Sequence, residues 1–141
     1  MTDTADDNLV GIVLVSHSLM LATSTAELAN QLGGGQVPVV AAGGTAGGQM
    51  GTSTDVIEGA VRAANRGAGV VLIPDIGSSV MTSQTMLAEL DPESKPEQPN
   101  AVIADAPFLE GAVAAAAAAG GGADMDSVVK AASEAYTHHK L

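Results

Sequence analysis

Four short apolar runs recur along the chain, and segments with a different spacing of apolar residues separate them. The runs span residues 11–15, 37–41, 69–73 and 101–104, and they are rich in β-branched side chains. Such runs are typical of strands that are buried on both faces of a parallel sheet. Pro38 lies near the start of the second run, where a strand beginning or a sheet edge tolerates its missing N–H.

Between and after these runs, apolar residues recur every three or four positions, which predicts five helices. Glycines at 33–35 and 120–122 indicate where two of these helices end. The positions expected to face the core are Leu21, Thr25, Leu28 and Leu32 in the first helix; Ile57, Ala60, Val61 and Ala64 in the second; Ser83, Met86, Leu87 and Leu90 in the third; Leu109, Ala112, Val113 and Ala116 in the fourth; and Met125, Val128, Val129, Ala132 and Tyr136 in the fifth.

Residues with helix-capping chemistry stand where these helices begin. Thr52 or Ser53 is expected to cap the second helix, and Ser78 or Ser79 the third. Pro107 occupies a first-turn position of the fourth helix, where its missing N–H costs nothing.

The alternation of strands and helices predicts an α/β fold. We expect one domain over residues 8–137, with short tails at 1–7 and 138–141. Its doubly wound, mainly parallel sheet of four to five strands should carry helices on both faces. The proline-containing segment 91–100 is expected to be a polar surface loop, and the alanine-rich stretch 112–119 a closely packed helix.

The composition excludes several classes of protein. The formal net charge is −11, from 16 acidic and five basic residues, which disfavours nucleic acids and anionic membranes as ligands. An acidic surface fits either a salt-loving source or basic protein partners. There is no cysteine, no apolar run long enough to span a bilayer, and an acidic N-terminus unlike a targeting segment. We therefore expect a soluble, cytoplasmic protein.

Candidate chemistry gathers where the predicted strands end. In open α/β sheets, ligands bind beyond the carboxyl ends of the strands. The segments there are 16–18, 42–48, 75–79 and 105–107, and the first contains His17, the one histidine away from the C-terminus. Around it, glycine, serine and threonine offer backbone N–H and hydroxyl donors without bulk, which indicates an anion-binding cradle.

His17 is the strongest candidate nucleophile in a chain without cysteine. To attack phosphorus, one ring nitrogen must be unprotonated and face outward. Asp75 would fix the tautomer by accepting the other N–H, provided that its strand neighbours the first. Helices that begin near Leu19 and Ser79 would present free amides to the phosphoryl oxygens. The expected phosphate-binding residues are Ser18, Gly43, Gly44, Gly77, Ser78 and Ser79.

Each of these residues also has a structural interpretation. A single histidine at a strand end is commonly a structural residue, Asp75 could simply cap a helix or turn, and the paired glycines could form a flexible turn. His138 and His139 are expected to belong to a solvated tail. Asp75 and Asp105 could hold a divalent ion, but the first strand would then be expected to end in carboxylates, so we expect no metal. P-loop, dinucleotide-binding and G-x-S-x-G motifs are absent.

Four segments together resemble a known family. They are 13–18, 41–53, 75–79 and 105–112, and they are similar, in the same order and spacing, to the phosphotransfer subunits called DhaM of phosphoenolpyruvate-dependent dihydroxyacetone kinases. That family is related to the IIA domains of mannose-type sugar phosphotransferase systems. The resemblance covers roughly residues 8–137. This chain differs from the usual pattern in having Pro74 before the aspartate.

The resemblance implies a function. His17 would take a phosphoryl group from the phosphohistidine of the carrier HPr and pass it to ADP held in the subunit DhaL, whose ATP phosphorylates dihydroxyacetone on the subunit DhaK. Asp75 would match the carboxylate that orients the histidine. The chain would need no cofactor of its own, and it would form a homodimer. Two alternatives stay open, namely a mannose-type IIA component of a sugar permease and a non-catalytic regulatory module with the same fold.

Overall fold

The computed structural model describes residues 8–90 and 98–141. Its centre is a four-stranded, all-parallel sheet in the order β2-β1-β3-β4. The predicted doubly wound α/β architecture is confirmed, with four strands in the described part of the chain. The strands are β1 (Gly11–Ser16), β2 (Val39–Gly43), β3 (Val70–Pro74) and β4 (Ala101–Ile103).

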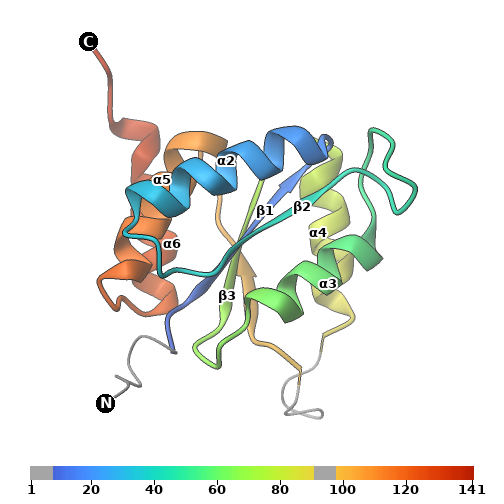
Figure 1. Cartoon of the computed structure of the whole chain (residues 1–141), viewed down its shortest axis with the longest axis horizontal. Helices are drawn as coiled ribbons and strands as arrows, with labels where there is room; N and C mark the ends of the chain where they lie inside the picture. Colours follow the sequence, from blue (N-terminus) through green and yellow to red (C-terminus); the bar gives the residue numbers. More distant parts are fainter. Residues whose placement is uncertain (1–7, 91–97) are drawn as a thin grey trace.

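Helices cover both faces of this sheet, as Figure 1 shows. Helices α2, α5 and α6 pack on one face, and α3 and α4 pack on the other. The helices are α2 (Leu19–Leu32), α3 (Thr54–Ala64), α4 (Ser78–Ala88), α5 (Phe108–Gly120) and α6 (Met125–Glu134), followed by the 3-10 turn η1 (Ala135–Thr137). Among the described residues, no helix is long and apolar enough to cross a membrane.

The central strand β1 is apolar throughout because both of its faces are buried. Ile12 and Leu14 belong to the core beneath α2 and α5, whereas Val13 and Val15 belong to the core beneath α3. All four side chains are fully buried. The edge strand β2 begins one residue after Pro38, whose carbonyl still accepts a hydrogen bond from the Ile12 N–H at 2.8 Å.

The predicted inward face of α2 is wrong. Leu21, Leu28 and Leu32 are 47%, 41% and 61% exposed, and of the predicted positions only Thr25 is buried. The face that packs inward consists of small residues, because α2 lies close against the sheet and against the alanine-rich helix α5. At the end of α2, an added Cβ on Gly33 would stand 2.7 Å from the Cβ of Ala116. The buried residues of α2 are Ala22, Thr25, Ala26 and Ala29.

Several smaller predictions have mixed outcomes. Ser53 caps α3 as expected, and the alanine-rich stretch forms the packed helix α5. Neither Ser78 nor Ser79 caps α4, because Gly77 holds the cap position and both serines lie within the first turn. Tyr136 is 58% exposed rather than buried. Most of the predicted surface loop, residues 91–97, lies outside the described residues.

The topology brings the ends of β1 and β3 together. Val15 pairs with Pro74 in the parallel register, and the Asp75 N–H donates to the Val15 carbonyl at 2.8 Å. The proline before Asp75 therefore ends β3 without displacing the aspartate from the sheet. Residues that follow these two adjacent strands meet at one edge of the sheet, as the sequence predicted.

Gly43 lets the end of β2 approach the start of α2, and this contact generates a stability prediction. A Cβ at Gly43 would lie 2.5 Å from the Leu19 Cα and 2.7 Å from the Ser18 carbonyl oxygen. We expect Gly43→Ala to lower the free energy of unfolding by about 1–3 kcal/mol, because the backbone of α2 must shift. Urea unfolding followed by circular dichroism measures this change.

Gly59→Ala is the matched control. Gly59 is exposed within α3, and apart from its chain neighbours and the nearby backbone of the same helix no atom lies within 4 Å of the position that its Cβ would take. Alanine should therefore stabilise this helix by about 0.5–1 kcal/mol. Equal effects of the two substitutions would contradict a close contact at Gly43.

Candidate active site

His17 stands in the short link between β1 and α2. Ser16 is the last residue of β1, and Ser18 caps α2 by accepting the Leu21 N–H at 3.2 Å. Both backbone polar groups of His17 are hydrogen-bonded. Its N–H donates to Asp75, and its carbonyl accepts from the Gly51 N–H at 3.0 Å. Its side chain is 30% exposed, so the ring is anchored but reachable from solvent.

Asp75 is the centre of a hydrogen-bonded cluster. Its Oδ2 accepts from the Ser16 hydroxyl at 2.9 Å and from the His17 N–H at 3.1 Å. Its Oδ1 accepts from the Ile76 N–H at 2.7 Å and from the Ser79 hydroxyl. The same Oδ1 lies 3.1 Å from Nδ1 of His17. The sequence analysis required that the strand before Asp75 lie next to the strand before His17, and β1 and β3 are indeed neighbours.

These contacts keep the Asp75 carboxylate charged. Burial by itself would raise the pKa of Asp75, but the hydrogen bonds outweigh it and hold that pKa below its ordinary value. The Ser79 hydroxyl contributes most to the lowering, followed by the Ile76 and His17 N–H groups and the Ser16 hydroxyl. Near neutral pH, Asp75 is therefore only an acceptor of hydrogen bonds.

An acceptor beside Nδ1 decides which ring nitrogen of His17 carries the proton. Nδ1–H can donate to Asp75 Oδ1, so the neutral ring keeps its proton there. Nε2 then carries no proton, and its lone pair accepts a hydrogen bond of 2.6 Å from the hydroxyl of Ser78. Nε2 therefore points away from Asp75 and toward the start of α4.

Backbone amides without a hydrogen-bond partner occur at the starts of the two helices that adjoin His17. Within the described part of the chain, the N–H groups of Gly77 and Ser78 at the start of α4 make no hydrogen bond, and neither do those of Leu19 and Met20 at the start of α2. A helix N-terminus with free donors favours a negatively charged group nearby. The arrangement around His17 is suited to hold a phosphoryl group.

The six predicted phosphate-binding residues have different positions. Ser78 lies against Nε2, and Ser79 lies behind the ring, 3.2 Å from Nδ1. Gly77 precedes both with φ +39°, a conformation that favours glycine. The remaining predicted residues have structural contacts: the Ser18 hydroxyl caps α2, Gly43 packs against Leu19, and the Gly44 N–H donates to the Ser16 carbonyl at 3.3 Å.

Ser16 is the residue that the sequence analysis missed. It is fully buried, and its hydroxyl contacts both Asp75 and the Ser18 N–H. A signal was present in the sequence, because Ser16 is the first polar residue after an unbroken apolar strand. A polar side chain at such a position needs a buried partner.

An uncharged apolar surface adjoins His17. A hollow of about 510 Å³ is lined by His17 together with Leu19, Met20 and Met50. These three side chains are 52%, 79% and 77% exposed, and we call them the apolar collar. No charged residue occurs in segments 18–26, 42–54 and 76–88, although the chain has 16 acidic residues.

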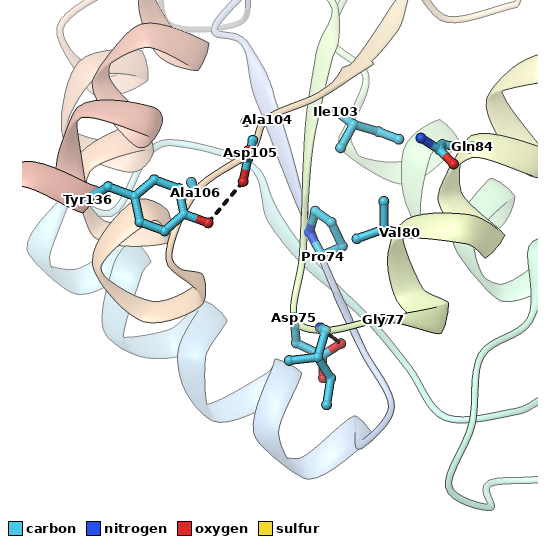
Figure 2. A pocket seen from close by; sticks show the side chains of 11 residues that line it. Pro74, Asp75, Gly77, Val80, Gln84, Ile103, Ala104, Asp105, Ala106 and Tyr136 are labelled. Atoms are coloured by element: carbon cyan, nitrogen blue, oxygen red, sulfur yellow. Dashed lines mark hydrogen bonds between the residues drawn. The ribbon is translucent and has the colours of Figure 1, made fainter.

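A second hollow, of about 550 Å³, lies on the other side of Asp75 (Figure 2). Asp105 and Tyr136 line it and are joined by a hydrogen bond of 2.9 Å from the tyrosine hydroxyl. Figure 2 shows Asp105 pointing toward Tyr136 and not toward Asp75. Among residues 8–90 and 98–141, no three His, Asp or Glu side chains gather as a metal site would require.

Known proteins share this sequence pattern. The family EIIA-man, described as "PTS system fructose IIA component", matches residues 11–129. A Listeria innocua serovar 6a protein is 32% identical over 107 residues, which cover 76% of this chain and 83% of that protein. A Providencia stuartii protein is 30% identical over 130 residues, covering 90% of this chain but only 27% of that longer protein. Both are described as the phosphoryl donor subunit DhaM of a PEP-dependent dihydroxyacetone kinase.

A solved structure shares the fold. It is described as that of an unknown function protein, EF1359, and it superimposes with a TM-score of 0.76 at 27% sequence identity. The match covers 88% of this chain and 92% of the other. The doubly wound arrangement described above is therefore found in a relative of similar size.

The hydrogen-bonded state of Asp75 generates a prediction about pH. Because its pKa in the folded protein is lower than its ordinary value of 3.8, ionised Asp75 stabilises the fold above that value, and the stabilisation is lost as the pH falls through the folded pKa. We expect the difference in free energy of unfolding between wild type and Asp75→Asn to shrink as the pH falls below about 4. Denaturant unfolding at a series of pH values measures it. A difference that stays flat to pH 3 would contradict the role of these hydrogen bonds.

Proposed function

This chain belongs to the EIIA-man family, and on that premise we propose that it is a phosphohistidine carrier that accepts a phosphoryl group on Nε2 of His17. Its relatives indicate a phosphotransfer role in the dihydroxyacetone kinase system. The observation that carries the proposal is the contact between Asp75 Oδ1 and His17 Nδ1, because it leaves Nε2 free to react. The donor in this proposal is the phosphohistidine of HPr, and the acceptor is ADP bound in the subunit DhaL.

The chemistry follows from the geometry around the ring. The Nε2 lone pair attacks phosphorus while the bond between phosphorus and the donor's histidine nitrogen breaks, and that nitrogen recovers its lone pair. Positive charge that grows on the imidazole is stabilised by Asp75. In the return step, an oxygen of the ADP β-phosphate attacks phosphorus, the N–P bond breaks, and ATP forms. The Ser78 hydroxyl, which bonds Nε2 in the free carrier, is placed to donate to a phosphoryl oxygen instead.

The surface around His17 supports transfer between proteins. The apolar collar offers exposed side chains that a partner can bury, and the neighbouring segments carry no charge that would repel a phosphoryl group. In the described part of the chain, no carboxylate lines the hollow beside His17, and the acidic residues elsewhere in the sequence favour a partner with basic residues around its own site. A small substrate would not need such a surface.

Several finer expectations belong to the same proposal. The ATP formed on DhaL would phosphorylate dihydroxyacetone bound to DhaK, and the carrier would need no cofactor of its own. It would act in the cytoplasm and as a homodimer. The description of the family as a fructose IIA component favours a second acceptor, namely the next component of a sugar permease.

Labelling tests the phosphohistidine. Incubation with phosphoenolpyruvate, enzyme I and HPr should give a label that acid removes and alkali does not. We expect His17→Ala to abolish this label, and Asp75→Asn to slow transfer by about 10- to 100-fold because the tautomer is no longer fixed. Normal transfer in Asp75→Asn would contradict its assigned role, and the absence of label in the wild type would favour a non-catalytic module.

Reconstitution separates the two acceptors. With DhaL carrying ADP, DhaK and dihydroxyacetone, labelled phosphate should arrive on dihydroxyacetone and should not do so when His17→Ala replaces the wild type. If the labelled carrier is stable toward DhaL but loses its label to a permease component, the dihydroxyacetone assignment is wrong and the sugar-transport assignment is favoured.

The apolar collar generates a separate kinetic prediction. Met20→Ser combined with Met50→Ser removes apolar area from the partner surface without touching the ring. We expect KM for the protein partners to rise about tenfold while kcat stays within about twofold. Leu32→Ser is the control, because Leu32 is 61% exposed at the opposite end of α2 and should leave both constants unchanged. A fall in kcat with constant KM would contradict a docking role.

A further inference from the structure

We propose that Ser16 is a positioning residue of this site, whose buried hydroxyl holds one oxygen of Asp75 so that the other faces Nδ1 of His17. The hydroxyl touches neither the reacting nitrogen nor the space where a phosphoryl group would sit. It would act entirely through the carboxylate. The kinetic consequence rests on the proposed function, whereas the geometric one concerns the free protein alone.

The hydrogen bonds of Ser16 give its hydroxyl proton a single direction. The oxygen accepts the Ser18 N–H at 3.0 Å, and it lies 2.9 Å from Asp75 Oδ2. Asp75 is ionised and can only accept, so the hydroxyl proton must point at Oδ2. Ser16 is fully buried, which excludes water as a competing partner.

The two oxygens of the Asp75 carboxylate therefore have different hydrogen-bond donors. Oδ2 is occupied by the Ser16 hydroxyl and the His17 N–H. Oδ1 accepts from Ile76 and Ser79 and is the oxygen that lies beside Nδ1. Without Ser16, only one donor would hold Oδ2, and rotation of the carboxylate about its Cβ–Cγ bond would be less restricted. Replacing a residue that orients a functional side chain in this way commonly lowers activity by about 10- to 100-fold.

Ser16 also joins the two strands and the helix that form the site. It ends β1, it contacts the residue that follows β3, and its hydroxyl accepts the N–H of the cap residue of α2. Three ionisable side chains lie around Asp75. His17 contacts it directly, and Asp105 and Tyr136 lie across the second hollow. None of these contacts the Ser16 hydroxyl within the described residues.

Ser16→Ala tests the inference, and Ser83→Ala is a matched control. Ser83 is also fully buried, but its hydroxyl makes no hydrogen bond in the described structure. We expect Ser16→Ala to lower kcat of phosphoryl transfer about tenfold with KM for the partners unchanged. Ser83→Ala should leave kcat and KM at wild-type values.

Two measurements on the free chain do not depend on the proposed function. Nitrogen-15 NMR of His17 should show the Nδ1–H tautomer dominant in the wild type and in Ser83→Ala, with a clear share of the Nε2–H tautomer in Ser16→Ala. The carbon-13 signal of the Asp75 carboxyl group should titrate at a higher pH in Ser16→Ala, because one donor to the carboxylate is lost. If no phosphate is transferred but both signals respond, the proposed function fails and the positioning role stands.

Unchanged tautomers and an unchanged Asp75 titration in Ser16→Ala would overturn the inference, whatever the rate. Equal losses in Ser16→Ala and Ser83→Ala would also overturn it, because a general packing effect would then explain both. If Ser16→Ala does not fold, Ser16→Cys replaces it, since a thiol fills the same space but is a weak donor, and the same outcomes apply.

Discussion

A single carboxylate organises the functional end of this molecule. Asp75 accepts hydrogen bonds from two hydroxyls, two backbone N–H groups and one ring nitrogen, and these donors come from the ends of β1 and β3 and the start of α4. An ionised group that is largely buried must be surrounded by donors, so the position of each donor is constrained by the charge at the centre. The orientation of His17 is one result of that constraint.

The sheet order makes this arrangement possible. Because β1 and β3 are adjacent and parallel, residues that are 58 positions apart in the sequence meet directly at the carboxyl ends of the two strands. Buried apolar residues stabilise the paired strands, and this packing does not involve the side chains of His17 or Asp75. The scaffold and the chemistry are therefore separable, which is a general property of open α/β folds.

The parts of this structure that sequence analysis could predict are those with strong periodic or positional signals. The four apolar runs gave the strands, their alternation with helical spacing gave the architecture, and the position of His17 after a strand indicated the candidate site. The inward face of α2 was not predictable from hydrophobicity, because close packing of the helix against the sheet and α5 favours Ala26 and Ala29 over the larger leucines. The position of Ser16 at the end of an apolar strand indicates that it has a buried partner, but the identity of that partner depends on the strand order, because Asp75 follows another strand.

The small residues between α2 and α5 have a consequence at the other end of α2. That helix has 14 residues, which corresponds to a length of about 21 Å, and it joins the tight contact between Gly33 and Ala116 to the capped end beside His17. Added bulk at Ala116 would tilt the whole helix and displace the amides of its first turn. The alanines of α5 thus restrict which side chains the protein can accept at a place remote from any reacting atom, and substitutions there could impair transfer while leaving every residue of the site intact.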